Sequence, residues 1–327
     1  MRKILSLALS AVLLIFGFIV PQSSDDISFE SGRGERLNSF EEILEALDSA
    51  DALASGSSLA EYDSISFSVK GEQILDYQYT REIYGERHYV AMEGTVNYEI
   101  EGRINDDGET FASYNVIMSA EGSSSSEIET AYIKVKLDMY ESDEDRYLRI
   151  RQYYSTSRTL LPAEKAVYLN KWLDISEGDF TGVTREIPIS VLGIIETMAE
   201  CLELYEDDFK KDGDSLIINR EKTLSEIFSS MSSASGLPIY VEGTVYEDSK
   251  IEIDMSNEYA PEIIIVCEAN YENVDEDGFI FGPENSATVS IKLFDVDDTD
   301  FDCDLRKSDI YDEEDVEDIF DTIGRGR

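Results

Sequence analysis

The sequence is poor in the residues from which most catalytic and metal centres are built. Its 327 residues include one histidine, His88, one tryptophan and three cysteines, with no Cys-x-x-Cys pair. A zinc site made of Cys and His is therefore nearly excluded. A Ser-His-Asp or Cys-His centre would have to use His88. No phosphate-binding glycine loop and no Gly-x-Ser-x-Gly sequence occurs, so we predict that the protein is not an enzyme.

Positive charge is also scarce. The chain has 27 Lys and Arg against 71 Asp and Glu, which gives a formal net charge of -44. Nucleic acids and anionic membrane surfaces repel such a chain, so neither is a predicted partner. Hydrophobic residues still make up 42% of the sequence, which is enough for a packed core.

The few cysteines allow at most one disulfide within the chain. Cys267 and Cys303 both lie in the C-terminal strand region and are the pair that such a bond would join. The alternative is that they are free, buried thiols.

The N-terminal residues predict export. A short basic start precedes an apolar run over residues 4–20, and polar residues follow. This order is typical of an export signal. We predict that residues 1–24 are an export signal or an uncleaved membrane tether, and that the protein is secreted or held outside the cytoplasmic membrane. Residues 25–38, rich in Ser, Gly and charge, are predicted to be a linker.

Three stretches repeat apolar residues at helical spacing. Residues 39–54 begin with the capping box Ser39-Phe-Glu-Glu42, in which each end residue can bond the backbone N–H of the other. Residues 191–209 form a second stripe. A second capping box, Thr223-Leu-Ser-Glu226, predicts the start of a third helix. Each apolar stripe needs a partner surface.

Between and after these stretches the sequence alternates apolar with polar residues, the pattern of strands. The alternation runs from Tyr62 to Ile175 with polar turns such as Asn105-Asp-Asp-Gly108, and it returns within residues 240–296. Residues 166–176, which include Trp172, are predicted to be the strand that closes the sheet.

These elements predict an α+β fold. We expect a large curved antiparallel sheet, a half-barrel, covered on its concave face by a few amphipathic helices. One domain should span residues 39–296. Residues 297–327 are strongly acidic and are predicted to form a partly disordered tail.

The order of elements resembles that of exported bacterial lipoprotein-carrier proteins (LolA/LppX-like). The resemblance rests on the helix at residues 39–54, on the segment Asn170-Lys171-Trp172-Leu173-Asp174 and on the helix pair that follows. In that family a half-closed sheet lidded by helices holds acyl chains. For residues 39–296, the resemblance implies a non-enzymatic protein that binds a hydrophobic small molecule or lipid.

A ligand between the sheet and the helices would be lined by Trp172, Leu192, Ile195 and Phe228. For Trp172 the alternative is a core anchor. For the whole protein the alternative is a cell-surface interaction or structural module without a pocket, whose tyrosine-rich strand face would be exposed. The sequence indicates no particular protein partner.

One string has the spacing of a calcium loop. Asn273, Asp275 and Asp277 stand at its first, third and fifth positions, Gly278 at the sixth and Glu284 at the twelfth. These would be the metal ligands, with glycine making the sharp turn. The alternative is a β-hairpin that turns at Asp277-Gly278. Apart from this calcium site, no cofactor is predicted.

Overall fold

The structure is a computed structural model of the chain. It describes residues 34–54, 59–83, 86–124, 128–142, 145–155, 170–174, 191–234, 244–245, 248–270, 273–274, 280–281, 284–297 and 310–311. The predicted export signal and most of the predicted linker and tail lie outside these residues. Within them, no helix has the length and apolar character needed to cross a membrane.

Most of the described chain belongs to one open sheet. Its long strands are β1 (Ile65–Ile83), β2 (Glu86–Ile104), β3 (Thr110–Ser124), β4 (Ile128–Glu141), β5 (Arg146–Ser155), β11 (Glu262–Asn270) and β14 (Glu284–Phe294). Its short strands are β6 (Trp172–Asp174), β7 (Lys210–Asp212), β8 (Ser215–Ile218), β9 (Thr244–Val245), β10 (Lys250–Asp254) and β15 (Ile310–Tyr311). The order is β15-β6-β5-β4-β3-β2-β1-β14-β11-β10-β8-β7, and β9 also pairs with β11. Neighbours are antiparallel except β15 and β6, which are parallel.

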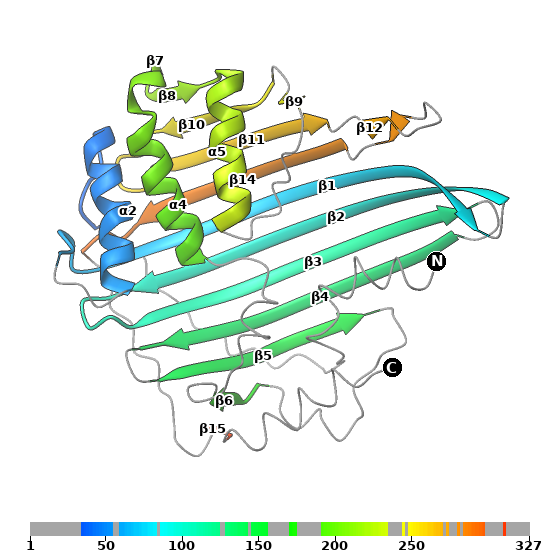
Figure 1. Cartoon of the computed structure of the whole chain (residues 1–327). Helices are drawn as coiled ribbons and strands as arrows, with labels where there is room; N and C mark the ends of the chain where they lie inside the picture. Colours follow the sequence, from blue (N-terminus) through cyan, green and yellow to red (C-terminus); the bar gives the residue numbers. More distant parts are fainter. Residues whose placement is uncertain are drawn as a thin grey trace.

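The helices α2 (Phe40–Ala54), α4 (Val191–Leu204) and α5 (Glu221–Ala234) lie on one face of this sheet, and the short 3-10 helix η2 (Glu206–Asp208) follows α4. They stand over one end of the sheet, while β1, β2, β3 and β4 run well past them (Figure 1). The predicted combination of a large antiparallel sheet with helices on it is therefore confirmed for the described residues.

Two local predictions are confirmed by hydrogen bonds. The Ser39 hydroxyl accepts from the Glu42 amide at 3.2 Å, and the Glu42 carboxylate accepts from the Ser39 amide at 3.0 Å. This is the reciprocal capping box that starts α2. Between β2 and β3, the Gly108 amide donates to the Asn105 carbonyl at 3.1 Å, and Gly108 has a φ of 75°. Glycine adopts this left-handed conformation without strain, so the predicted turn closes the hairpin there.

The second predicted capping box is wrong. Helix α5 begins at Glu221, so Thr223 lies inside its first turn. The Thr223 hydroxyl donates to the Asp208 carboxylate at 2.6 Å, and the Arg220 guanidinium approaches the same carboxylate. These contacts hold the pKa of Asp208 below its usual range and tie η2 to the start of α5.

One face of the sheet, here called the inner face, carries Ile65, Phe67 and Val69 and packs against the helices. The register aligns one apolar residue from each of nine strands into a continuous row: Leu216, Ile253, Ile263, Ile291, Val69, Ile100, Tyr114, Leu137 and Ile150. All except Leu216 are buried. Because alternate side chains of a strand share a face, this register gives the domain one core between sheet and helices.

Large side chains on the inner face lie over glycines of the neighbouring strand. The ring of Phe67 occupies the space that a Cβ on Gly102 would need, and the ring of Tyr98 does the same over Gly71. The aromatic residue of each pair restores the apolar surface that the glycine lacks, so the sheet stays tightly packed.

The packed body extends beyond residues 39–296 at both ends. Leu37 is fully buried in the core, and its amide donates to the Glu258 carbonyl at 2.6 Å. The Glu35 amide donates to the Val296 carbonyl at 2.7 Å. At the other end, residues 310–311 form β15 against β6. Of the predicted closing strand, residues 166–176, the structure describes β6 alone as strand, and β15 lies outside it in the sheet.

Candidate functional site

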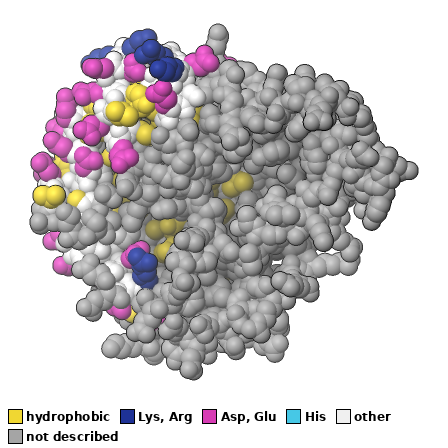
Figure 2. Space-filling view, viewed as in Figure 1, with side chains coloured by type: hydrophobic (Ala, Val, Ile, Leu, Met, Phe, Trp, Pro, Cys, Tyr) yellow, Lys and Arg dark blue, Asp and Glu magenta, His cyan; other side chains and the backbone are white. Residues whose placement is uncertain are grey.

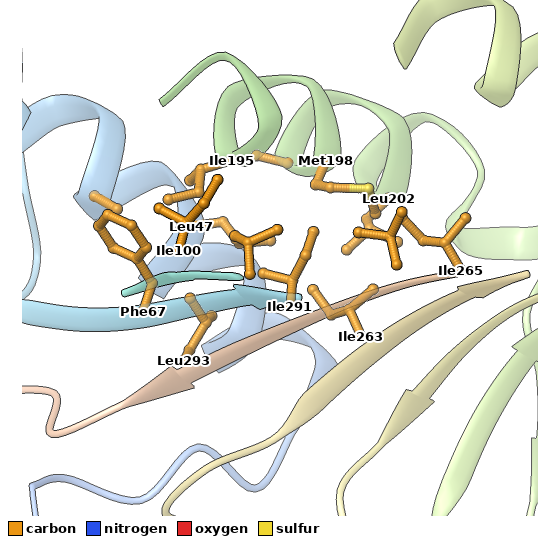
Figure 3. Packing of buried hydrophobic residues seen from close by; sticks show 14 of the residues in the cluster. Leu47, Phe67, Ile100, Ile195, Met198, Leu202, Ile263, Ile265, Ile291 and Leu293 are labelled. Carbon is orange, nitrogen blue, oxygen red and sulfur yellow. The ribbon is translucent and has the colours of Figure 1, made fainter. Parts of the chain in front are cut away.

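The described members of the predicted ligand lining do not share one surface: two are core residues, and Trp172 lies on the other face of the sheet. Ile195 on α4 and Phe228 on α5 are fully buried in the core cluster. Figure 3 shows Ile195, Met198 and Leu202 of α4 above the sheet residues Ile263, Ile265 and Ile291, with side chains interleaved. Leu192 lies in the first turn of α4, and its side chain is outside the described residues. Directly beneath this part of α4, the described side chains form a core.

Trp172 is on the opposite face of the sheet, here called the outer face, so it is not part of a lining shared with Ile195 and Phe228. Its neighbour Leu173 pairs with Leu148 in the inner-face core, and successive residues of a strand point to opposite faces. The indole of Trp172 lies instead under the guanidinium of Arg149, 4.6 Å from ring centre to Cζ. The alternation of the strand was evident in the sequence, but which side would face the helices was not.

The partner of Arg149 is a buried carboxylate. Asp138 on β4 is 1% exposed and accepts from Arg149 Nε at 2.9 Å and Nη2 at 2.6 Å. Its other oxygen accepts from the Ser113 hydroxyl at 2.7 Å, and Arg151 Nε lies 3.8 Å away. The register shifts by one residue between β4 and β5 here, next to Arg151, which is two residues from Arg149 and on the same face of the strand. Such a fully bonded buried ion pair fixes the positions of β4, β5 and β6.

The inner face changes character where the strands leave the helices. Close to the helices, Val69, Ile100 and Tyr114 are buried; farther along β2 and β3, Val96 and Val116 are only half-buried. Figure 1 shows β1 to β4 continuing well past the helices. We call the inner-face positions of β1 to β4 from Val116 and Val96 onward the inner-face extension. Its described side chains are Val96, Val116 and the buried Gln73, which pairs with Val96. The two half-buried valines, continuous with the core, are the kind of surface that a hydrophobic ligand needs.

The buried tyrosines at the start of this extension are neutral. Burial raises the pKa of Tyr98 and of Tyr114 well above the ordinary tyrosine value. No charge therefore arises from them on this surface at neutral pH, which suits contact with apolar groups.

The predicted calcium loop lies mostly outside the described residues. Strand β12 (Asn273–Val274) pairs antiparallel with β13 (Ile280–Phe281), so a two-stranded ribbon flanks residues 275–279. Asp275 and Asp277, and the side chains of Asn273 and Glu284, are not described. Within the described part of the chain, no group of three or more His, Cys, Asp or Glu side chains could hold a metal ion. Calcium at this loop stays a prediction.

The described face on the helix side carries mainly acidic side chains. Figure 2 shows Asp and Glu spread over it, with Lys and Arg in a few small groups. These acidic side chains of the described surface oppose approach to anionic surfaces.

Cys201 and Cys267 are free, buried thiols. Burial raises the pKa of Cys201 to about 11 and that of Cys267 to about 12. Cys303 lies outside the described residues.

We expect both buried thiols to resist alkylation. The thiolate is the reactive form, and these groups stay protonated until the pH rises far above 9, so iodoacetamide at pH 7 should label them roughly 100-fold more slowly than in denatured protein. Peptide mapping of labelled residues by mass spectrometry measures each site separately. Rapid labelling of Cys267 at pH 7 would contradict its burial under the helices.

Comparison with known proteins adds no family assignment: no protein-family model and no curated protein matches this sequence.

Proposed function

We propose that this is an exported, non-enzymatic protein that holds a hydrophobic ligand, such as the acyl chain of a lipid, on the inner face of its sheet. The observation that supports it most is that Val96 and Val116, which pack against the edge of the core, are apolar and only half-buried. In this proposal the sheet is a half-barrel, and its concave side is the inner face.

The proposal places the ligand beside the helix-covered core. The side chains of Ile195 and Phe228 fill the space beneath their helices and support the sheet. The ligand would lie along the inner-face extension, where the strands are long enough for an acyl chain. A strand rises about 3.3 Å per residue, so ten residues of β2 span about 33 Å.

The pair Val116 and Ile117 separates the two faces of the sheet. They are adjacent on β3, both half-buried, and on opposite faces. Val116→Glu should weaken binding of a dansyl-labelled fatty acid at least tenfold, because its carboxylate would have to lose water against an apolar chain. Ile117→Glu should leave that binding unchanged. Fluorescence titration of the full-length variants measures both.

Native mass spectrometry of the full-length protein gives an independent reading, since a carrier should retain a lipid-sized adduct that Val116→Glu loses. Val116→Ser is a milder variant should the glutamate disturb folding, and thermal melts of all variants report on that. The carrier proposal fails if the protein shows neither an adduct nor fatty-acid binding. The inner-face location fails if Ile117→Glu weakens binding as much as Val116→Glu.

A further inference from the structure

The outer face of the sheet has a depression of about 520 Å³ over the central strands β14, β1, β2 and β3. Its polar walls come from four strands: Lys70, Glu72, Asn97, Asn115, Thr288 and Ser290. This volume lies within the roughly 300–1,000 Å³ typical of small-molecule sites.

The register explains why a hollow forms here. Thr288, Glu72 and Asn97 lie side by side in one row across the strands, and Ser290, Lys70, Glu99 and Asn115 lie in the next. The hydroxyl residues and asparagines are shorter than the Lys and Glu beside them. Because short and long side chains alternate on this face, the short ones form the bottom of a depression and the long ones its sides.

One ammonium and two carboxylates, those of Lys70, Glu72 and Glu99, line this depression. The Lys70 ammonium and the Glu99 carboxylate form an ion pair, and the Asn115 side chain also bonds to Glu99. The Asn115 side-chain oxygen is buried and accepts no hydrogen bond from the described residues, and the Ser290 hydroxyl donates to Glu262. Asn97 and Thr288 add an amide and a hydroxyl, which both donate and accept and can recognise a ligand.

Two apolar side chains lie among these polar groups. Ile117 borders the depression, and Ile74, in the next row of β1, is 39% exposed. A ligand suited to this surface offers hydroxyl groups at its rim and carbon–hydrogen bonds on its flat side.

Several ligand classes fit poorly. Anions meet the two carboxylates of Glu72 and Glu99 on a chain of net charge -44, and a cation would have to compete with the Lys70 ammonium that already pairs with Glu99. An extended peptide would need an unpaired strand edge, but β1 is hydrogen-bonded on both sides, to β2 and to β14. We infer that the depression binds a neutral saccharide. This site is on the opposite face from the lipid surface proposed above and does not depend on it.

Calorimetric titration of the full-length protein with neutral trisaccharides tests this inference. We would use maltotriose and tri-N-acetylchitotriose, with an anionic galacturonate trimer and a cationic glucosamine trimer as comparators. At least one neutral sugar should bind with a Kd below about 1 mM, and the charged trimers at least tenfold more weakly. No binding of either neutral sugar at about 10 mM, or equal binding of the charged ones, would overturn the inference.

Variants locate the binding on the outer face. Asn97→Ala and, independently, the exposed Glu72→Ala should each weaken sugar binding at least tenfold. Val96→Ala changes the adjacent residue on the inner face and should leave it unaltered. Thermal midpoints confirm that the variants fold. Sugar binding that both outer-face variants retain in full would place the sugar elsewhere and refute the assignment.

Discussion

Leu202→Ala should lower the free energy of unfolding by about 3 kcal/mol, because it empties a fully buried position under α4. Leu202 is 0% exposed and lies above Ile265 in the core between α4 and the sheet (Figure 3). Removing a buried leucine side chain loses its transfer free energy and leaves a cavity that the surrounding residues only partly fill. The measurement is denaturant unfolding of the full-length protein, in which the midpoint should fall without a change in slope.

The matched control is Leu204→Ala, two residues farther along the same helix. Leu204 is 73% exposed, so its truncation should change the stability by no more than about 0.5 kcal/mol. The comparison keeps residue type, helix and substitution the same and changes only burial. Equal, small effects at both positions would mean that α4 does not pack against the sheet. The predicted ligand site between the helices and the sheet would then be favoured again.

Local signals in the sequence were sufficient for the elements that form locally. The alternation of Ile65, Phe67 and Val69 predicts a strand with one buried face, and all three are buried. The capping box at Ser39 predicts the start of α2 because its bonds join residues three apart. In both cases the residues that determine the local structure are close in the sequence, so the sequence pattern is enough to predict that structure.

Contacts between distant segments had no such signal. Strand β1 pairs with β14, more than 200 residues later, and the sequence offers no rule for that choice. The same limit applies to Thr223, whose hydroxyl bonds Asp208 of η2, 15 residues earlier, rather than capping α5. A hydroxyl near a helix start satisfies either partner, and tertiary packing decides between them.

In the candidate site, too, local features could be predicted from the sequence and contacts between distant segments could not. Helical spacing correctly placed Ile195 and Phe228 on apolar stripes, but a stripe that fills a core and a stripe that lines a cavity have the same sequence pattern. Trp172 and Leu173 are adjacent, both apolar and both buried, so the sequence did not tell which of them faces the helices. The outer face near β6 is itself packed, since Phe111 and Tyr140 are buried there.

Asp138→Ala should destabilise the protein by about 3 kcal/mol, because it leaves the largely buried guanidinium of Arg149 without its partner. The Arg149 side chain is 19% exposed and bonds Asp138 through two nitrogens, and the Ser113 hydroxyl also loses its acceptor. Because Arg149 lies on the ring of Trp172, the emission of this single tryptophan should shift as well. Denaturant unfolding and intrinsic fluorescence measure the two effects.

An exposed ion pair on the same face is the control. Glu99→Ala removes the ion-pair partner of Lys70. The Glu99 side chain is 43% exposed and that of Lys70 is 55% exposed, so this substitution should lower the free energy of unfolding by less than about 1 kcal/mol. Salt separates the two further, because roughly 1 M salt screens an exposed pair far more than a buried one. The cost of Asp138→Ala should therefore persist in high salt, while that of Glu99→Ala disappears. A cost for Asp138→Ala that also disappears in salt, with unchanged tryptophan emission, would mean that the Asp138–Arg149 contact is open to water and does not hold β4, β5 and β6 together.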